Sequence, residues 1–336
     1  MVLKRSIAAA ARSRAFAAVV GLLERADTGR SYLLPVLTYH RVAPFDPRPD
    51  LYPGLISATP EEFEAQMLYL SRRFRIMPME AIVDARSSGQ LPRRSLAITF
   101  DDAYADFLDH AWPALRRHRI DVTMFIPTAF PGNPERTFWW DRLYRAIASD
   151  ERTTTDTPLG RLPLADAADR RRAFDAIRAF IKTRPFEEAD TIVDSLERPP
   201  IEERIGAVMT WTDLRMLATD GVTLASHTRN HAILSQIDEA AIEREVRSSV
   251  DDLHRAVGPT LPVFAYPSGG HSAAAAGILT RLGFAAAFTT ERGTNDIRSA
   301  DWMRLRRINV GRRSTLALIR AQLVSRPAGP ARRSSR

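Results

Sequence analysis

Two histidines stand four residues apart in the sequence, at His227 and His231. In a helical turn this spacing would put both imidazoles on one face, where they could bind the same metal ion. Such a pair also occurs often by chance, so an exposed or structural role is the simpler interpretation of the histidines alone. The zinc-protease motif is excluded, because it requires Glu directly after the first histidine and this chain has Thr228.

A pair of adjacent carboxylates, Asp101 and Asp102, follows the apolar run at residues 96–100. Two carboxylates at the end of a buried strand are costly unless a cation or hydrogen-bond donors accompany them. Adjacent residues of a strand point in different directions, so one carboxylate could bind a metal while the other faces a substrate as a base. The alternative is an aspartate pair that caps the following helix.

Seven short apolar runs with strand character occur after residue 31, and most of them end abruptly in a polar residue or a proline. Helical patterns lie between the runs, and the clearest one begins at the N-cap Asp238 and stops at Gly258. Strands that alternate with helices indicate a parallel sheet, and about seven strands predict an α/β fold, a closed or nearly closed (β/α) barrel. The runs are residues 33–39, 96–100, 122–126, 222–225, 263–265, 285–288 and 308–310.

The barrel prediction also gives a domain division. Residues 1–30 form an N-terminal helical extension, residues 31–320 the barrel domain, and residues 321–336 a disordered basic tail. Residues from about 131 to 205 break the rhythm of strands and helices, which indicates a mostly helical insertion beside the active face. In such barrels the C-terminal strand ends gather on one face, so polar residues far apart in the sequence converge there.

The composition limits the chemistry. The chain has no cysteine, so disulfides and thiolate metal sites are excluded, and a transition metal must be held by histidine nitrogens and carboxylate oxygens. A net charge of +8 and a pI near 10.3 favour anionic partners. The arginines are scattered and no nucleic-acid motif is present, so we expect no nucleic-acid partner. The oligomeric state stays open.

The N-terminus combines basic residues, Lys4 and Arg5 among them, with an apolar run at residues 15–23. This arrangement is similar to a signal peptide, but no small-x-small cleavage site follows the run. An amphipathic helix that packs on the domain or contacts a membrane surface is the simpler interpretation. We therefore expect a cytoplasmic or membrane-peripheral protein, with export left open.

Taken together, these features resemble carbohydrate esterase family 4, the polysaccharide deacetylases with a NodB homology domain. Residues 99–102, Thr-Phe-Asp-Asp, are similar to the first motif of that family, and residues 226–231, Ser-His-Thr-Arg-Asn-His, to the second. Residues 264–269, Phe-Ala-Tyr-Pro-Ser-Gly, are similar to the third motif of one branch, and residues 38–42 to its opening strand. The likeness spans residues 33–312, the insertion excepted.

The resemblance implies hydrolysis of N-acetyl groups on an amino-sugar glycan. It implies that Asp102, His227 and His231 are metal ligands and that Asp101 is the general base. The backbone N–H of Tyr266, which precedes Pro267, would then help to hold the oxyanion. Zn²⁺ is the expected ion, although iron(II) or cobalt would suit the same ligands.

Two elements of the family pattern are missing, the Arg of the third motif and the Leu-x-His of the last motif. We hypothesise that Arg307, just before the last strand, pairs with Asp101 and keeps it ionised. We further hypothesise that His40, at the end of the first strand, protonates the leaving amine. A hydrogen-bonded pocket histidine is the alternative for His40.

The missing residues leave two other functions open. One is a non-catalytic carbohydrate-binding relative that keeps the barrel without turnover. The other is a hydrolase of small non-peptide amides, which a narrow pocket closed by the insertion would favour.

Overall fold

The computed structural model describes residues 14–26, 29–45, 51–133, 136–184, 186–197 and 207–324. Its centre is a closed barrel of seven parallel strands, in the order β1-β13-β11-β10-β9-β6-β5, with β5 pairing back onto β1. The predicted α/β barrel is therefore confirmed, and each of the seven predicted runs overlaps one barrel strand. The strands are β1 (Leu33–Tyr39), β5 (Ser95–Asp101), β6 (Thr123–Ile126), β9 (Thr223–Ser226), β10 (Val263–Ala265), β11 (Ala286–Arg292) and β13 (Leu305–Asn309).

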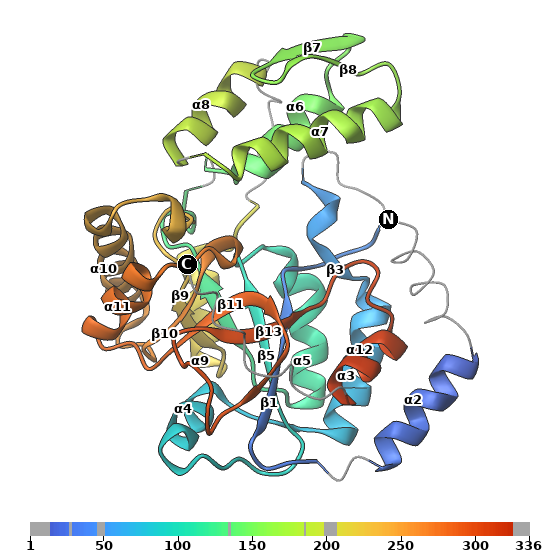
Figure 1. The fold of residues 1–336 in the computed structure, drawn as a ribbon, viewed down its shortest axis with the longest axis vertical. Helices are drawn as coiled ribbons and strands as arrows, with labels where there is room; N and C mark the ends of the chain where they lie inside the picture. Colours follow the sequence, from blue (N-terminus) through green and yellow to red (C-terminus); the bar gives the residue numbers. More distant parts are fainter. Residues whose placement is uncertain are drawn as a thin grey trace, which may run out of the picture.

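Helices surround the barrel (Figure 1). The helix α10 begins where the sequence predicts, because the Asp238 side chain accepts a hydrogen bond from the Ala241 N–H, and it buries Ile242, Val246 and Leu253. These helices are α3 (Pro60–Arg73), α4 (Met79–Ser88), α5 (Trp112–His118), α9 (Trp211–Thr219), α10 (Glu239–Val257), α11 (Ala273–Arg281) and α12 (Leu316–Val324).

Short elements complete the barrel domain. The strands β4 and β12 pair with β5 and β1, and β2 and β3 form a separate two-stranded sheet. The bounds of these strands are β2 (Arg41–Val42), β3 (Ile56–Ala58), β4 (Arg75–Ile76) and β12 (Thr294–Asp296). Four single-turn helices are η1 (Pro53–Leu55), η2 (Phe107–Ala111), η3 (Leu234–Gln236) and η4 (Pro267–Gly269).

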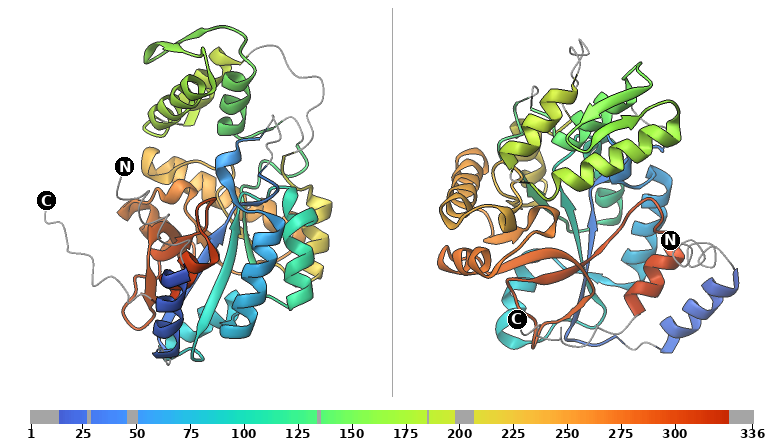
Figure 2. Two further views of the ribbon diagram at one scale, coloured as in Figure 1. Left: turned by 90° about the vertical axis from the view of Figure 1, so that its right-hand side faces the viewer. Right: turned by 45° about the horizontal axis from the view of Figure 1, so that its top comes forward.

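A separate helical layer lies over one end of the barrel (Figures 1 and 2). Within the predicted insertion, the described residues form three helices and a β-hairpin around an apolar cluster that includes Leu143, Phe174, Ile177 and Val193. The division into barrel and insertion stays a prediction. The elements are α6 (Trp139–Ala148), β7 (Thr154–Thr157), β8 (Gly160–Pro163), α7 (Ala167–Ile181) and α8 (Phe186–Leu196).

The first and last described helices meet on the side of the barrel, where α2 (Arg14–Ala26) packs on α12. The Glu24 carboxylate binds the Arg320 guanidinium through two hydrogen bonds of 2.8 and 2.7 Å. Residues 321–324 belong to α12, so the predicted tail starts later than residue 321, and residues 1–13 and 325–336 lie outside the described part. Among the described residues, no helix has the length and apolarity needed to span a bilayer.

Candidate active site

The aspartate pair lies at the C-terminal end of β5, where the backbone changes direction. Asp101 is the last residue of the strand, whereas Asp102 has a left-handed backbone with φ of 73°. Aspartate adopts this conformation more readily than most residues, although it is strained. The change of conformation separates the directions of the two carboxylates, and both residues are buried, with 2% of their surface exposed.

The histidine pair follows β9 in an irregular loop. His227 comes directly after the strand, and Thr228 and His231 have left-handed φ values of 62° and 58°. The two imidazoles are therefore not aligned by a helical turn, because two left-handed residues cannot belong to a right-handed helix. The loop still brings the two imidazoles together, with ring centroids 4.9 Å apart.

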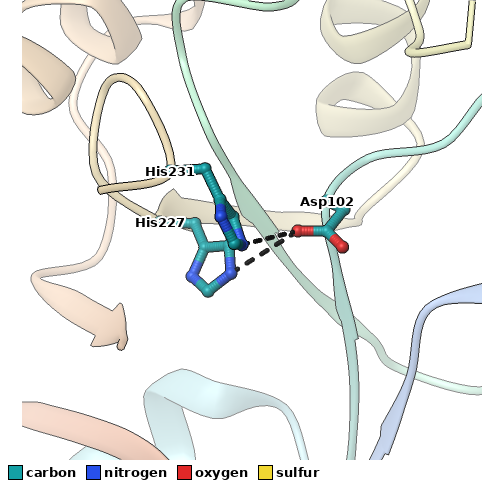
Figure 3. Close-up of side chains that lie close together, drawn as sticks. All are labelled: Asp102, His227 and His231. Carbon is teal, nitrogen blue, oxygen red and sulfur yellow. Dashed lines mark ion pairs between the residues drawn. The ribbon is translucent and has the colours of Figure 1, made fainter. Parts of the chain in front are cut away.

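Asp102, His227 and His231 converge on one point (Figure 3). Each offers one ligand atom, and these atoms lie within 4.8 Å of one another. The Oδ1 atom of Asp102 lies 3.6 Å from His227 Nε2 and 3.3 Å from His231 Nε2. Among the described residues this buried oxygen has no hydrogen-bond partner, which is costly unless a cation binds it. Two imidazoles and a carboxylate fit one divalent transition-metal ion.

The orientation of His227 supports this assignment. Its Nδ1 lies 2.7 Å from the Ala265 carbonyl oxygen. Because a carbonyl can only accept, Nδ1 carries the proton and Nε2 directs its lone pair toward Asp102, as in metal-ligating histidines. Burial, opposed by the charge of Asp101, lowers the pKa of His227 to about 4. The imidazole is therefore neutral at pH 7, as a metal ligand must be.

Arg307, from β13, pairs with Asp101. Its Nη1 and Nη2 atoms donate to Asp101 Oδ1 and Oδ2 over 2.8 and 2.7 Å. Its Nε donates to the Thr289 carbonyl over 2.9 Å, and the arginine is fully buried. Burial alone would raise the pKa of Asp101, but the charge and hydrogen bonds of Arg307, together with the charges of His227 and His40, hold that pKa below its usual range. The hypothesised pair is present, whereas its catalytic role stays a prediction.

His40 lies on the same face, directly after β1. Its backbone N–H donates to Ser57 Oγ over 3.0 Å, and the residue lines the cavity above the metal ligands. His40, Asp101 and Asp102 thus line the same cavity. Whether it acts as the acid stays a prediction.

The structure does not place the predicted oxyanion donor at the site. The backbone N–H of Tyr266 donates to the Phe288 carbonyl over 2.9 Å, as part of the pairing of β10 with β11. Its hydroxyl donates to the Met303 carbonyl over 3.0 Å, and the ring is fully buried. Pro267 is buried and has no N–H. The residue of this turn that lines the cavity is Ser268.

Residues of the helical layer line one part of the cavity, which has a volume of about 230 Å³. Trp140 packs its ring against His231, with centroids 4.9 Å apart, and its Nε1–H donates to the Tyr104 hydroxyl over 2.8 Å. That hydroxyl donates to Asp141 Oδ2 over 2.7 Å, so a buried network positions the tryptophan. Sequence reasoning gave no role to Ser268, although it lies in the third motif, and it missed several lining residues that lie outside the motifs. These are Tyr52, Leu55, Arg178, Lys182 and Thr290.

The sequence profile of the polysaccharide deacetylase family matches residues 180–287, a span that includes His227 and His231. Over this span the chain is similar to the polysaccharide deacetylase family. This family comprises hydrolases that act on carbon–nitrogen bonds other than peptide bonds. The match covers the part of the barrel that carries both histidine ligands, whereas Asp101, Asp102 and Arg307 come from outside it.

Curated members of the family are similar over part of their length. Poly-beta-1,6-N-acetyl-D-glucosamine N-deacetylase of Staphylococcus epidermidis is 30% identical over 106 residues, which is 29% of this chain and 37% of that protein. The enzyme of the same name from Staphylococcus aureus is 30% identical over 77 residues, 23% of this chain and 27% of that protein. The matched region thus spans about a third of these relatives.

Solved structures share the fold over most of the chain. The deacetylase PplD from Streptococcus pyogenes, in complex with acetate, has a TM-score of 0.59 at 18% identity and covers 88% of this chain and 99% of its own. IcaB from Ammonifex degensii has a TM-score of 0.57 at 18% identity, with the same coverage of 88% and 99%. At this identity the likeness establishes the barrel alone.

Proposed function

We propose that this protein hydrolyses N-acetyl groups of an amino-sugar glycan, using one divalent metal ion held by Asp102, His227 and His231. The observation that carries the proposal is the buried, unpartnered Asp102 Oδ1 facing two histidine nitrogens, directly beside an ionised carboxylate. The match of residues 180–287 to the polysaccharide deacetylase profile supports the same reaction. Zn²⁺ is the proposed ion, because a two-His, one-carboxylate set suits it, although iron(II) and cobalt share that preference.

Each side chain has a defined task in this proposal. A bound divalent ion supplies Lewis acidity and an easily deprotonated water. Asp101 accepts the proton of the attacking water, because Arg307 keeps it ionised at neutral pH. His40 donates a proton to the amine that leaves. Trp139 and Trp140 shield the cavity from bulk water and can pack against the sugar.

The substrate class follows from the relatives and the cavity. The staphylococcal relatives are named for poly-beta-1,6-N-acetyl-D-glucosamine, and we propose a substrate of that kind, an N-acetylated polysaccharide or lipid-linked saccharide. The Asp101–Arg307 pair argues against a non-catalytic relative. The third motif lacks its usual arginine, and Arg307 provides a guanidinium beside the proposed base, Asp101, in its place. The small volume of the cavity favours one alternative, hydrolysis of small non-peptide amides.

Acetate release with metal analysis tests the proposal. The purified protein should bind one metal ion per chain and release acetate from N-acetylated oligosaccharides. We expect Asp101→Asn to keep the metal and lose turnover, and His227→Ala to lose both. His254→Ala is the matched control, because His254 is exposed at the end of α10 and should keep both. A metal-loaded protein that releases no acetate from any saccharide would refute the proposal, and turnover of small amides alone would favour the alternative.

We also propose peripheral contact with a membrane surface. The side chains of Val19, Leu22 and Leu23 on α2 are 55%, 63% and 52% exposed, while Val20 and Glu24 on the same helix are buried. An apolar helix face on a chain of net charge +8 suits an anionic bilayer. Leu22→Asp should reduce sedimentation with anionic vesicles and leave acetate release unchanged; equal sedimentation of both proteins would refute the contact.

A further inference from the structure

The helix α7 lies along two cavities. Arg178, in its C-terminal part, and Lys182, the residue after its end, line the cavity above the metal ligands. Its N-terminal part lines a second cavity of about 810 Å³ with Arg170 and Arg171. Tyr52 lines both cavities, so they adjoin. One face of α7 therefore continues from the metal site into the larger cavity.

Cationic side chains gather in this second cavity from two distant parts of the chain. Arg170 and Arg171 come from α7, and Arg312 and Arg313 come from the loop after β13. One carboxylate, Asp175, is among the lining residues that the structure describes, and it pairs with the neighbouring Arg178 at 3.3 Å. The positive charge of the cavity is thus largely uncompensated.

Three of these arginines are available to a ligand. Arg171, Arg312 and Arg313 are exposed, and none pairs with a carboxylate among the described residues. Arg312 stacks over the Phe45 ring, 4.8 Å from its centroid, which limits its freedom. Guanidinium groups bind phosphate and carboxylate with paired hydrogen bonds, so a group of arginines around one cavity suits an oxyanion.

The cavity also has an aromatic wall. The rings of Tyr52 and Phe174 lie 4.5 Å apart, and Tyr144 lies 5.9 Å from Tyr52. The Arg178 guanidinium lies over Tyr52, 5.4 Å from the ring centroid. Flat amphipathic rings beside hydrogen-bonding cations suit a sugar that carries a charged group. From Arg171 to Lys182 the helix and its last turn rise about 16 Å, so the two cavities would hold different units of one saccharide.

We propose that the arginine-lined cavity binds an oxyanion of the saccharide, so that the substrate is an anionic N-acetylated saccharide whose phosphate or carboxylate lies away from the reacting acetamide. This inference rests on the proposed function, which it makes more specific. Because the oxyanion lies remote from the reacting bond, it contributes binding that is equal in the ground state and the transition state. It therefore lowers KM and leaves kcat unchanged.

Rates on three saccharides of equal length test the inference, with the zinc-loaded full chain. One saccharide is neutral, one contains uronate and one ends in phosphate. We expect the wild type to show kcat/KM values about tenfold higher on at least one anionic saccharide, equivalent to about 1.4 kcal/mol. The triple variant R171A/R312A/R313A should lose this advantage through KM and keep the neutral rate. If the triple variant loses the higher kcat/KM on the saccharide that ends in phosphate, the cavity binds phosphate. If it loses the higher kcat/KM on the saccharide that contains uronate, the cavity binds carboxylate.

A second triple variant, R172A/R247A/R255A, is the matched control. It removes the same charge from exposed arginines that do not line the cavity, one of them on α7, and should keep the preference for anionic saccharides. At about 1 M salt the wild-type preference should shrink, because the screening length falls to about 3 Å. A wild type without preference, or equal losses in both triple variants, would overturn the inference.

Calorimetric binding separates this inference from the proposed function. The Asp101→Asn protein is titrated with the same three saccharides, so no turnover is needed. Tighter binding of an anionic saccharide, lost in the R171A/R312A/R313A background, supports the inference even if no acetate is ever released. Equal binding of neutral and anionic saccharides overturns it, even if the wild type deacetylates both.

Discussion

The substitution Arg307→Ala gives the sharpest prediction, because it leaves Asp101 buried without its cation. The side chains of Arg307 and Asp101 are 0% and 3% exposed, so solvent does not screen their interaction. Removing one partner of a buried pair costs about 3–5 kcal/mol of unfolding free energy. This loss is a large fraction of a typical domain's stability of about 5–15 kcal/mol. We expect a matching fall in the free energy of unfolding measured in urea.

The same substitution should shift the pH dependence of turnover. In the wild type the lowered pKa of Asp101 keeps the base ionised, and the associated stability is lost only as pH falls through that low pKa. Without Arg307, burial dominates and raises the pKa of Asp101 above its usual range. The acid limb of kcat/KM should therefore move to higher pH, with the metal kept saturating.

Two further variants keep this prediction testable if Arg307→Ala folds poorly. Arg307→Lys keeps the charge and loses the paired hydrogen bonds, so both effects should be smaller. A double-mutant cycle combines Arg307→Ala with Asp101→Asn. The loss of unfolding free energy in the double variant should be smaller than the sum of the two single losses by more than about 1 kcal/mol. Arg161→Ala breaks the exposed pair with Asp156 and is the control. An Arg307→Ala protein with wild-type stability and an unmoved acid limb would refute the reasoning.

Three other changes have defined outcomes. Tyr104→Phe leaves the Asp141 carboxylate and the Trp140 Nε1–H without their shared partner, and should cost about 1–3 kcal/mol in urea unfolding; an unchanged midpoint would argue against the network. Gly269→Ala would put a Cβ 2.0 Å from Thr290 Oγ1 at a φ of +74°, so we expect lower thermal stability and weaker substrate binding. The control is Gly160→Ala, where nothing lies within 4 Å of the added Cβ, and it should alter substrate binding little. Metal removal by a chelator should lower the melting temperature, and Zn²⁺ should restore it, with a melting temperature that rises with the logarithm of the free Zn²⁺ concentration above Kd. No change would mean that the fold does not bind the ion.

Much of the barrel could be predicted from the sequence, because its strands are short apolar runs that stop at polar residues. The ends of β5 and β9 carry the aspartates and histidines, so the strand pattern and the chemistry support one another. Arg307 could be placed for the same reason, since it lies in the last strand next to the first. The hairpin of β7 and β8 was not predicted, because its Thr- and Asp-rich sequence lacks an apolar alternation.

The parts that failed depend on contacts that the sequence does not encode locally. The spacing of His227 and His231 would align their rings in a helical turn, but two left-handed residues, Thr228 and His231, shape an irregular loop instead. The Tyr266 N–H was assigned to an oxyanion, but its partner in β11 becomes visible only when the strands pair. Arg178 and Lys182 reach the site because of how α7 packs over the barrel.

X-ray absorption at the metal edge of the zinc-loaded protein tests the metal site most directly. A single ion should show two imidazole nitrogens and one carboxylate oxygen among its protein ligands, at distances of about 2.0–2.2 Å. His231→Ala should lose one imidazole, and the exposed-site variant His254→Ala should leave the spectrum unchanged. A spectrum without histidine ligands, or one that His231→Ala does not alter, would contradict the assignment of Asp102, His227 and His231 as the metal site.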